Sequence, residues 1–371
     1  MDFAFTHEHE ELRQTVRKFM EKESSEATVR KLMETEAGFD RALWGRLASE
    51  LSLLGLAIPE QYGGAGLGAV ELAIVMEEMG RVLFCAPFLS SAVMASNAIL
   101  LAADDAAKAK LLPTIAEGKS IGTVAVAEKE GRWNIDNIET RAKRDGSAWK
   151  LDGVKNYVID GAQADIVLVV ARTDDGVALF QVDSKAAGLE RSDLPTLDLT
   201  RKLAQLTFKA TPALRISSGD VSAALKRVMA LAVTALAAEQ VGGAQRCLEI
   251  STDYAKTRLQ FGRPIGSFQA IKHKCADMLV DVEFARSAAY GAAFAAAGDT
   301  DDEFFTAAHS ARSFCSETYF RAAADTIQIH GGMGFTWEHP AHLYFKRARA
   351  SSVMFGDPAV HRQAVAASLG I

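Results

Sequence analysis

The sequence predicts an α+β fold in which a small β domain lies between two helical regions. Apolar residues recur at three- and four-residue intervals before residue 119 and again after residue 221, as they do in amphipathic helices. Between these regions, short β-branched segments are separated by glycine or aspartate. Because 371 residues exceed what one hydrophobic core usually supports, we expect three domains: an N-terminal helical domain (1–119), a middle β domain (120–218) and a C-terminal helical domain (219–371).

The N-terminal region is predicted to be a series of helices. Residues 7–32 and 40–55 each place apolar side chains on one helical face. A proline and four glycines in residues 59–68 then end the helical pattern. This glycine run superficially fits a phosphate-binding loop, but a helical rather than a strand pattern precedes it, which argues against a Rossmann fold. Further helices are expected over residues 70–81 and 87–118.

The middle region carries the strand pattern. Four predicted strands are rich in β-branched or aromatic side chains and are bounded by turn residues, namely residues 122–128, 149–159, 165–171 and 177–182. From Ser222 the helical period returns nearly to the end of the chain, and clusters of glycine and proline divide it into several helices.

Composition excludes several classes of function. A formal net charge of −6 argues against a nucleic-acid partner, which needs a clustered basic surface. The four cysteines lie far apart and none forms a CxxC pair, so we expect reduced thiols in the core and no metal site. The N-terminus is acidic and lacks the features of a signal peptide, and no uncharged run reaches the ~18 residues of a spanning helix. We expect a cytoplasmic protein without membrane insertion.

One motif follows a long amphipathic helix that ends near Thr257. It reads Arg258-Leu-Gln-Phe-Gly-Arg-Pro-Ile-Gly-Ser-Phe-Gln269. A cation at this place is favoured by the helix C-terminus whatever else it does. A guanidinium can also bind pyrophosphate oxygens through two N–H groups, and Phe261 can stack near an adenine or its ribose. The motif therefore predicts a nucleotide contact.

A second motif, Gln328-Ile-His-Gly-Gly-Met-Gly-Phe335, is rich in glycine. The missing side chains permit a close backbone approach to a ligand and turns with positive φ. Alone, such a cluster is a weak signal. We expect His330 to be a structural hydrogen-bonding residue rather than a catalytic base, because it lies beside a tight glycine turn.

Both motifs resemble those of the acyl-CoA dehydrogenase flavoprotein family, and the resemblance covers essentially the whole chain. It implies an N-terminal helical domain, a small middle β domain and a C-terminal four-helix bundle. It also implies an oligomer, most often of four subunits, in which these motifs bind the FAD of a neighbouring subunit. The FAD contacts that it implies are Arg258, Gln260, Phe261, Gln328, Gly331 and Gly332.

The chain departs from the family where a subunit binds its own flavin. The family loop Thr-Glu-Pro-Gly-x-Gly-Ser-Asp corresponds here to residues 127–134, in which only Glu128 and Gly131 match. The family strand Lys-x-Trp-Ile-Thr-Asn corresponds to residues 155–160, with tyrosine in place of tryptophan and isoleucine in place of threonine. Hydrogen-bond donors to the flavin are lost, each worth on the order of 1 kcal/mol.

The usual catalytic base is also absent. Alignment on Arg362 puts Phe355 where the family has a glutamate, and the alternative family position, on the long helix, holds Ala232. Glu239 lies two helical turns further along the same face, among small and apolar neighbours that would raise the pKa of an unpaired carboxylate. We predict Glu239 as the base, with Asp357 as the second candidate. Alternatively, Glu239 forms an ion pair with a neighbouring helix or faces water.

The family's reaction is the FAD-dependent α,β-dehydrogenation of an acyl-CoA to a trans-2-enoyl-CoA, with electrons passed to an electron-transferring flavoprotein. This chain keeps the half-site that serves a neighbour and has altered its own. That combination resembles the family members that form α₂β₂ heterotetramers with a second dehydrogenase chain and act on CoA thioesters of sterol or bile-acid side chains. We therefore predict such a subunit.

Two other functions remain open. The chain could be an inactive scaffold that only completes a partner's FAD site, or an oxygen-using flavoprotein related to acyl-CoA oxidases or nitroalkane oxidases. The sequence does not identify the acyl group, the partner or the subunit that carries the base. Small residues on the long helix, such as Gly242 and Gly243, either widen an acyl pocket or let helices pack closely.

Overall fold

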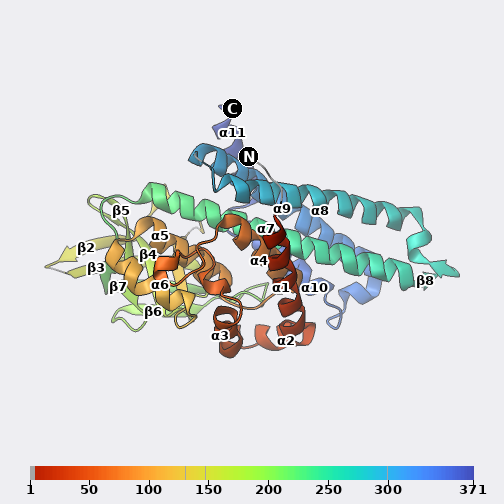
Figure 1. Ribbon diagram of the computed structural model, residues 1–371, viewed down its shortest axis with the longest axis horizontal. Helices are drawn as coiled ribbons and strands as arrows, with labels where there is room; N and C mark the ends of the chain where they lie inside the picture. Colours follow the sequence, from red (N-terminus) through yellow and green to blue (C-terminus); the bar gives the residue numbers. More distant parts are fainter. Residues whose placement is uncertain (1–4, 130, 147, 299) are drawn as a thin grey trace. The chain divides into compact units, whose positions relative to one another are not determined.

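The computed structural model describes residues 5–129, 131–146, 148–298 and 300–371. Contacts divide the chain into two compact units. One comprises residues 1–30, 69–84 and 233–371, and the other comprises residues 31–68 and 85–232. The predicted order of helical, β and helical regions is confirmed (Figure 1). The three domain boundaries stay a prediction, because the two units do not follow the order of the chain.

The N-terminal helices form where predicted, but the first is broken. Residues 7–32 form α1 (His7–Glu23) and α2 (Glu26–Met33). The break occurs because Ser25 caps α2, its hydroxyl oxygen accepting a hydrogen bond from the Thr28 N–H at 3.2 Å. The other elements are α3 (Arg41–Ser49), the 3₁₀ turns η1 (Leu53–Gly55) and η2 (Glu60–Tyr62), α4 (Ala69–Arg81), the π-helical η3 (Leu89–Ala95), α5 (Ser96–Ala102) and α6 (Asp105–Ala116).

The sheet of seven strands belongs to the second unit. Its strands are β1 (Gly122–Ala125), β2 (Arg141–Asp145), β3 (Ala148–Ile159), β4 (Ile166–Thr173), β5 (Gly176–Asp183), β6 (Leu189–Asp193) and β7 (Leu203–Arg215). The pairings β4–β2, β2–β3, β3–β7, β7–β5 and β5–β4 close a ring, with β1 beside β4 and β6 beside β7. β4 is buried along nearly its whole length, as its unbroken apolar run requires.

The long helices of the first unit lie side by side (Figure 1). α7 (Ser222–Thr257) enters this unit at residue 233, and its neighbours are α8 (Gln269–Ala295) and α9 (Asp301–His330). Alanines dominate the core that the three helices share. The remaining elements are the hairpin β8 (Leu259–Gln260) and β9 (Arg263–Pro264), η5 (Ile265–Ser267), η6 (Gly331–Phe335), α10 (Ala341–Val353) and α11 (Pro358–Ser368).

The structure bears on two further expectations, the state of the cysteines and the presence of membrane-spanning helices. Cys85, Cys247 and Cys315 are buried free thiols, as predicted, and Cys275 is half-buried. In the described ranges, every helix is too short or too polar to cross a bilayer.

Three glycines let helices approach closely. A Cβ atom at Gly80 of α4 would overlap the backbone carbonyl of Glu239 on α7, and one at Gly242 of α7 would overlap the carbonyl of Glu77 on α4. A Cβ atom at Gly243 would overlap the ring of Tyr319 on α9. Of the two functions considered for these small residues, close helix packing is therefore the one that the structure supports.

We expect Gly242→Ala to lower the free energy of unfolding by about 1–3 kcal/mol, because the new methyl group meets backbone that cannot move aside. The matched control is Gly291→Ala in α8, where an added Cβ has no neighbour within 4 Å. That substitution should stabilise the helix by up to ~1 kcal/mol through helix propensity. Urea unfolding of both variants provides the measurement, and equal effects at the two positions would contradict the close crossing.

Candidate functional site

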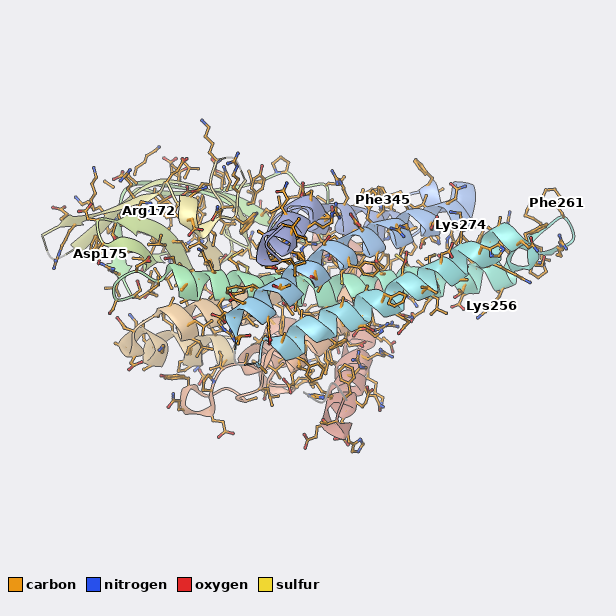
Figure 2. All side chains as sticks on the ribbon, turned by 90° about the horizontal axis from the view of Figure 1, so that it is seen from above. Arg172, Asp175, Lys256, Phe261, Lys274 and Phe345 are labelled. Carbon is orange, nitrogen blue, oxygen red and sulfur yellow. The ribbon has the colours of Figure 1, made fainter. Side chains whose placement is uncertain are left out.

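The first predicted motif forms a projecting hairpin. α7 ends with the Arg258 N–H donating to the Tyr254 carbonyl oxygen at 2.8 Å, and the Ile265 N–H closes the hairpin on the Arg258 carbonyl oxygen at 2.8 Å. Phe261 lies at the tip with φ of 53° and is 90% exposed. Figure 2 shows this ring beyond the ends of α7 and α8, with Lys256 and Lys274 on the two helices behind it. An exposed aromatic ring in a strained conformation indicates a binding surface.

The glycine motif caps α9. Gly331 ends the helix with φ of 59°, and its N–H donates to the carbonyl oxygens of Ile327 and Gln328. A Cβ at either Gly331 or Gly332 would find no atom within 4 Å, and both residues are exposed, as is Gln328. The backbone here is therefore open to a ligand, as the sequence predicted.

Contacts between α7 and α9 bring the two motifs together. The rings of Tyr254 and His330 stack with their centroids 4.2 Å apart. Tyr254 lies one helical turn before Arg258, and His330 lies two residues after Gln328. One further turn back, the Ser251 hydroxyl donates to the Thr326 hydroxyl at 3.0 Å. The six predicted FAD contacts therefore lie on two adjacent helix ends of one compact unit, namely Arg258, Gln260, Phe261, Gln328, Gly331 and Gly332.

His330 has the structural role that the sequence predicted. It is buried, and its Nδ1 donates to the Thr326 carbonyl oxygen at 2.8 Å. Its ring also contacts that of His339, with centroids 4.3 Å apart. Burial lowers the pKa of His330 more than the hydrogen bond to Thr326 raises it. A neutral imidazole held in this way supports the end of α9.

Neither base candidate has a geometry that singles it out. Glu239 is 5% exposed, and its Oε1 lies 3.7 Å from Nε of Arg347 on α10. This is the ion pair left open as the alternative for Glu239. Asp357 is exposed and caps α11, its carboxylate accepting from the Val360 N–H at 2.9 Å. The assignment of either residue as the base stays a prediction.

The turn that carries Phe355 is held by an arginine that sequence reasoning missed. Phe355 is buried with φ of 61°, and Gly356 follows with φ of 108°. Arg312 of α9 is fully buried and donates to the carbonyl oxygen of Met354 at 2.7 Å and to that of Ser351. These two carbonyl groups lie more than thirty residues from Arg312 in sequence, so no local sequence motif predicts the contact.

A buried ion pair supports the altered loop of the β domain. The Lys155 ammonium is fully buried and donates to Glu128 Oε1 at 2.7 Å. Burial lowers the pKa of Lys155 to about 8 against the attraction of Glu128, while Lys155 and the Thr140 N–H hold the pKa of Glu128 below its usual value despite burial. Gly131 has φ of 70°, and Glu130 of this loop lies outside the described residues.

Among the described residues, no group of His, Cys, Asp or Glu is arranged to hold a metal ion.

Comparisons with known proteins agree over the whole chain. Models of the N-terminal, middle and C-terminal domains of acyl-CoA dehydrogenases match residues 6–119, 123–210 and 222–370. The acyl-CoA dehydrogenase IpdE2 of Mycolicibacterium smegmatis is 37% identical over 353 residues, which cover 95% of each chain. The solved structure of a Tcur3481-Tcur3483 steroid ACAD variant has a TM-score of 0.89 at 33% identity and covers 98% of both chains. The ChsE4-ChsE5 complex from Mycobacterium tuberculosis has a TM-score of 0.91 at 29% identity, covering 100% of this chain and 99% of that one.

The depressed pKa of Lys155 predicts a dependence of stability on pH. Between about pH 8 and 10.5 the unfolded chain binds a proton at Lys155 that the folded chain has lost, so stability gains up to about 3 kcal/mol as pH rises through this window. The variant Lys155→Met should lack this gain. In the control Lys150→Met, which removes an exposed amine from the same strand, the gain should persist. Parallel stability curves for wild type and Lys155→Met, measured by urea unfolding at each pH, would contradict the assignment.

Proposed function

The chain belongs to the acyl-CoA dehydrogenase family, and on this premise we propose that it is one subunit of an α₂β₂ heterotetramer that oxidises a bulky acyl-CoA. Members of this family are FAD-dependent oxidoreductases that act on the CH–CH bond of acyl-CoA thioesters, and this chain is such an enzyme. The observation that carries the proposal is the contrast between its two half-sites for flavin. One is intact and exposed, and the other lacks the groups that the reaction requires.

The exposed half-site suits the pyrophosphate and adenosine of an FAD held by another chain. Arg258 offers an exposed cation, Phe261 offers an exposed ring, and the backbone at Gly332 is open. Gln260, Gln328 and Gly331 complete the set on the same helix ends. When bound, FAD supplies a ring that accepts the β-hydrogen of the acyl group as a hydride.

The chain's own half of the chemistry is incomplete. Ile159 is buried and has no hydroxyl to donate where the family has a threonine. Phe355 cannot accept the α-proton, and a positioned base is worth roughly 10²–10⁴-fold in rate. We place these missing functions on a second dehydrogenase-like chain that retains the Thr-Glu-Pro-Gly loop, unless Glu239 serves as the base.

The substrate that we propose is the CoA thioester of a sterol or bile-acid side chain, oxidised to a trans-2-enoyl-CoA with an electron-transferring flavoprotein as acceptor. Support comes from the structural relatives, of which one is described as a steroid ACAD and another as a complex of two chains, ChsE4 and ChsE5. A scaffold subunit that contributes to the enzyme only by completing a partner's FAD site is the second candidate, and the phenylalanine at position 355 is the observation that favours it.

Flavin content tests the assembly. We expect little FAD in the chain purified alone, and FAD in about half of the chains when a partner is co-expressed, because only the sites that combine this chain's exposed half-site with the partner's flavin loop are complete. Arg258→Met should lower this content, since the pyrophosphate loses a bidentate cation. Lys256→Met removes an exposed cation from the same helix end and serves as the control. One FAD per chain in a homotetramer would refute the heteromeric proposal.

Glu239→Gln distinguishes a base from a buried ion-pair partner. Because Arg347 lies beside Glu239, we expect the variant to lose about 3–5 kcal/mol of stability while exchange of the substrate α-proton in the reconstituted enzyme is unchanged. Asp357→Asn keeps a capping side chain and tests the second base candidate in the same assay. A fall of roughly 10²–10⁴-fold in the exchange rate, at intact flavin content, would instead identify Glu239 as the base.

A further inference from the structure

A bulge in β3 separates the environments of Lys155 and Tyr157, two residues that would share one face of a regular strand. Lys155 pairs with Leu206 of β7 and Val158 pairs with Ala204, so Asn156 and Tyr157 together face Gln205. β3 therefore has one extra residue at the bulge, and Tyr157 accommodates it by adopting a φ of 54°, a backbone conformation that is costly for an aromatic residue. As a result the Lys155 side chain is fully buried, whereas Tyr157 is 45% exposed.

Lys155 and Glu128 join three segments of the β domain beneath this bulge. The Lys155 ammonium donates to Glu128 Oε1 at 2.7 Å and to the Val126 carbonyl oxygen at 2.9 Å. The Glu128 carboxylate also accepts from the backbone N–H groups of Glu139 at 2.6 Å and Thr140 at 2.8 Å. One buried ion pair thereby ties the end of β1, the bulge of β3 and the entry to β2.

The exposed ring lies directly on the loop that the pair holds. The Gly131 N–H donates to the Glu128 carbonyl oxygen at 2.8 Å, and a Cβ on Gly131 would lie 3.0 Å from Tyr157 Cε2. The Asn156 N–H donates to the Ala127 carbonyl oxygen at 2.9 Å. A larger residue at position 131 would therefore displace the ring, and movement of Glu128 would move its support.

Stability alone does not account for this arrangement. A buried ion pair is often no more stable than well-packed apolar side chains of the same volume, and left-handed φ at an aromatic residue adds strain. Strained residues persist where the surroundings hold them for a functional reason. Here the surroundings are Glu128 and Lys155, and the strained residue presents an exposed ring.

We propose that the Lys155–Glu128 pair is a positioning device that holds the Tyr157 ring against the loop at Gly131. The position of this ring in turn determines the shape of the surface that this chain presents to flavin. The link to flavin rests on the proposed function. The positioning itself does not, because every contact that carries it lies within the β domain of this chain.

Hydrogen exchange tests the positioning without flavin. In Lys155→Met, amides of residues 126–134 and 155–158 should exchange about tenfold faster or more, because charge-assisted hydrogen bonds that order them are lost. The control is Lys150→Met, which breaks an exposed ion pair with Asp145 on the same β2–β3 hairpin and should leave these amides unchanged. Unchanged exchange in Lys155→Met would overturn the proposal.

A double variant distinguishes positioning from mere stability. Lys155→Met combined with Glu128→Gln removes both charges, and the amide oxygen at position 128 can still accept from the backbone N–H groups of Glu139 and Thr140, which should restore the denaturation midpoint toward wild type. If the pair positions Tyr157, exchange in these segments stays fast, and the visible circular dichroism of the flavin in the reconstituted enzyme stays altered. If both recover with stability, the pair is only structural and the proposal fails. A wild-type heteromer without flavin would refute the proposed function while the exchange result still decides the positioning.

Discussion

The close crossing of α4 and α7 is the constraint on which the helical unit depends. Gly80 and Gly242 each lie against a backbone carbonyl of the facing helix, so the two helices approach more closely than side chains would permit. This approach leaves Glu77 and Glu78 of α4 almost without exposure. Because a buried carboxylate is costly unless it is paired, the neighbouring helices must supply cations. The arginines that do so, from α1 and α8, are Arg13, Arg17 and Arg286.

The same fixed helix carries the exposed half-site. α7 is held against α4 at Gly242, and one of its last turns stacks on the end of α9 through Tyr254 and His330. Beyond these contacts the hairpin projects, and the ring of Phe261 is almost fully exposed. A rigid support beneath an exposed cation and ring is the arrangement expected of a pre-organised binding surface. Under the proposed function, the ligand of this surface is the FAD of a neighbouring chain.

Sequence reasoning succeeded where a structural requirement is encoded locally. Helical periods, the four apolar strands and the positive φ of Gly331 all follow from short patterns, and each is present. The strands β2, β6 and β7 were missed because charges and Pro212 interrupt their alternation. The buried contacts of Lys155 and Arg312 were missed for a different reason. Each has hydrogen-bond partners distant in sequence, and only the fold shows that these charged side chains are fully buried.

The β domain bears on whether this chain is a scaffold or an enzyme subunit. A scaffold needs its domain to fold, but it has no use for a strained aromatic residue held outward by a buried ion pair. Tyr157 is such a residue. The burial of Lys155 is costly, because it lowers the pKa of the ammonium group to about 8. The loop that lost the family's hydrogen-bond donors is therefore not merely degraded, because a costly arrangement still orders it. This favours a subunit whose own flavin-facing surface is built around an aromatic ring over a scaffold.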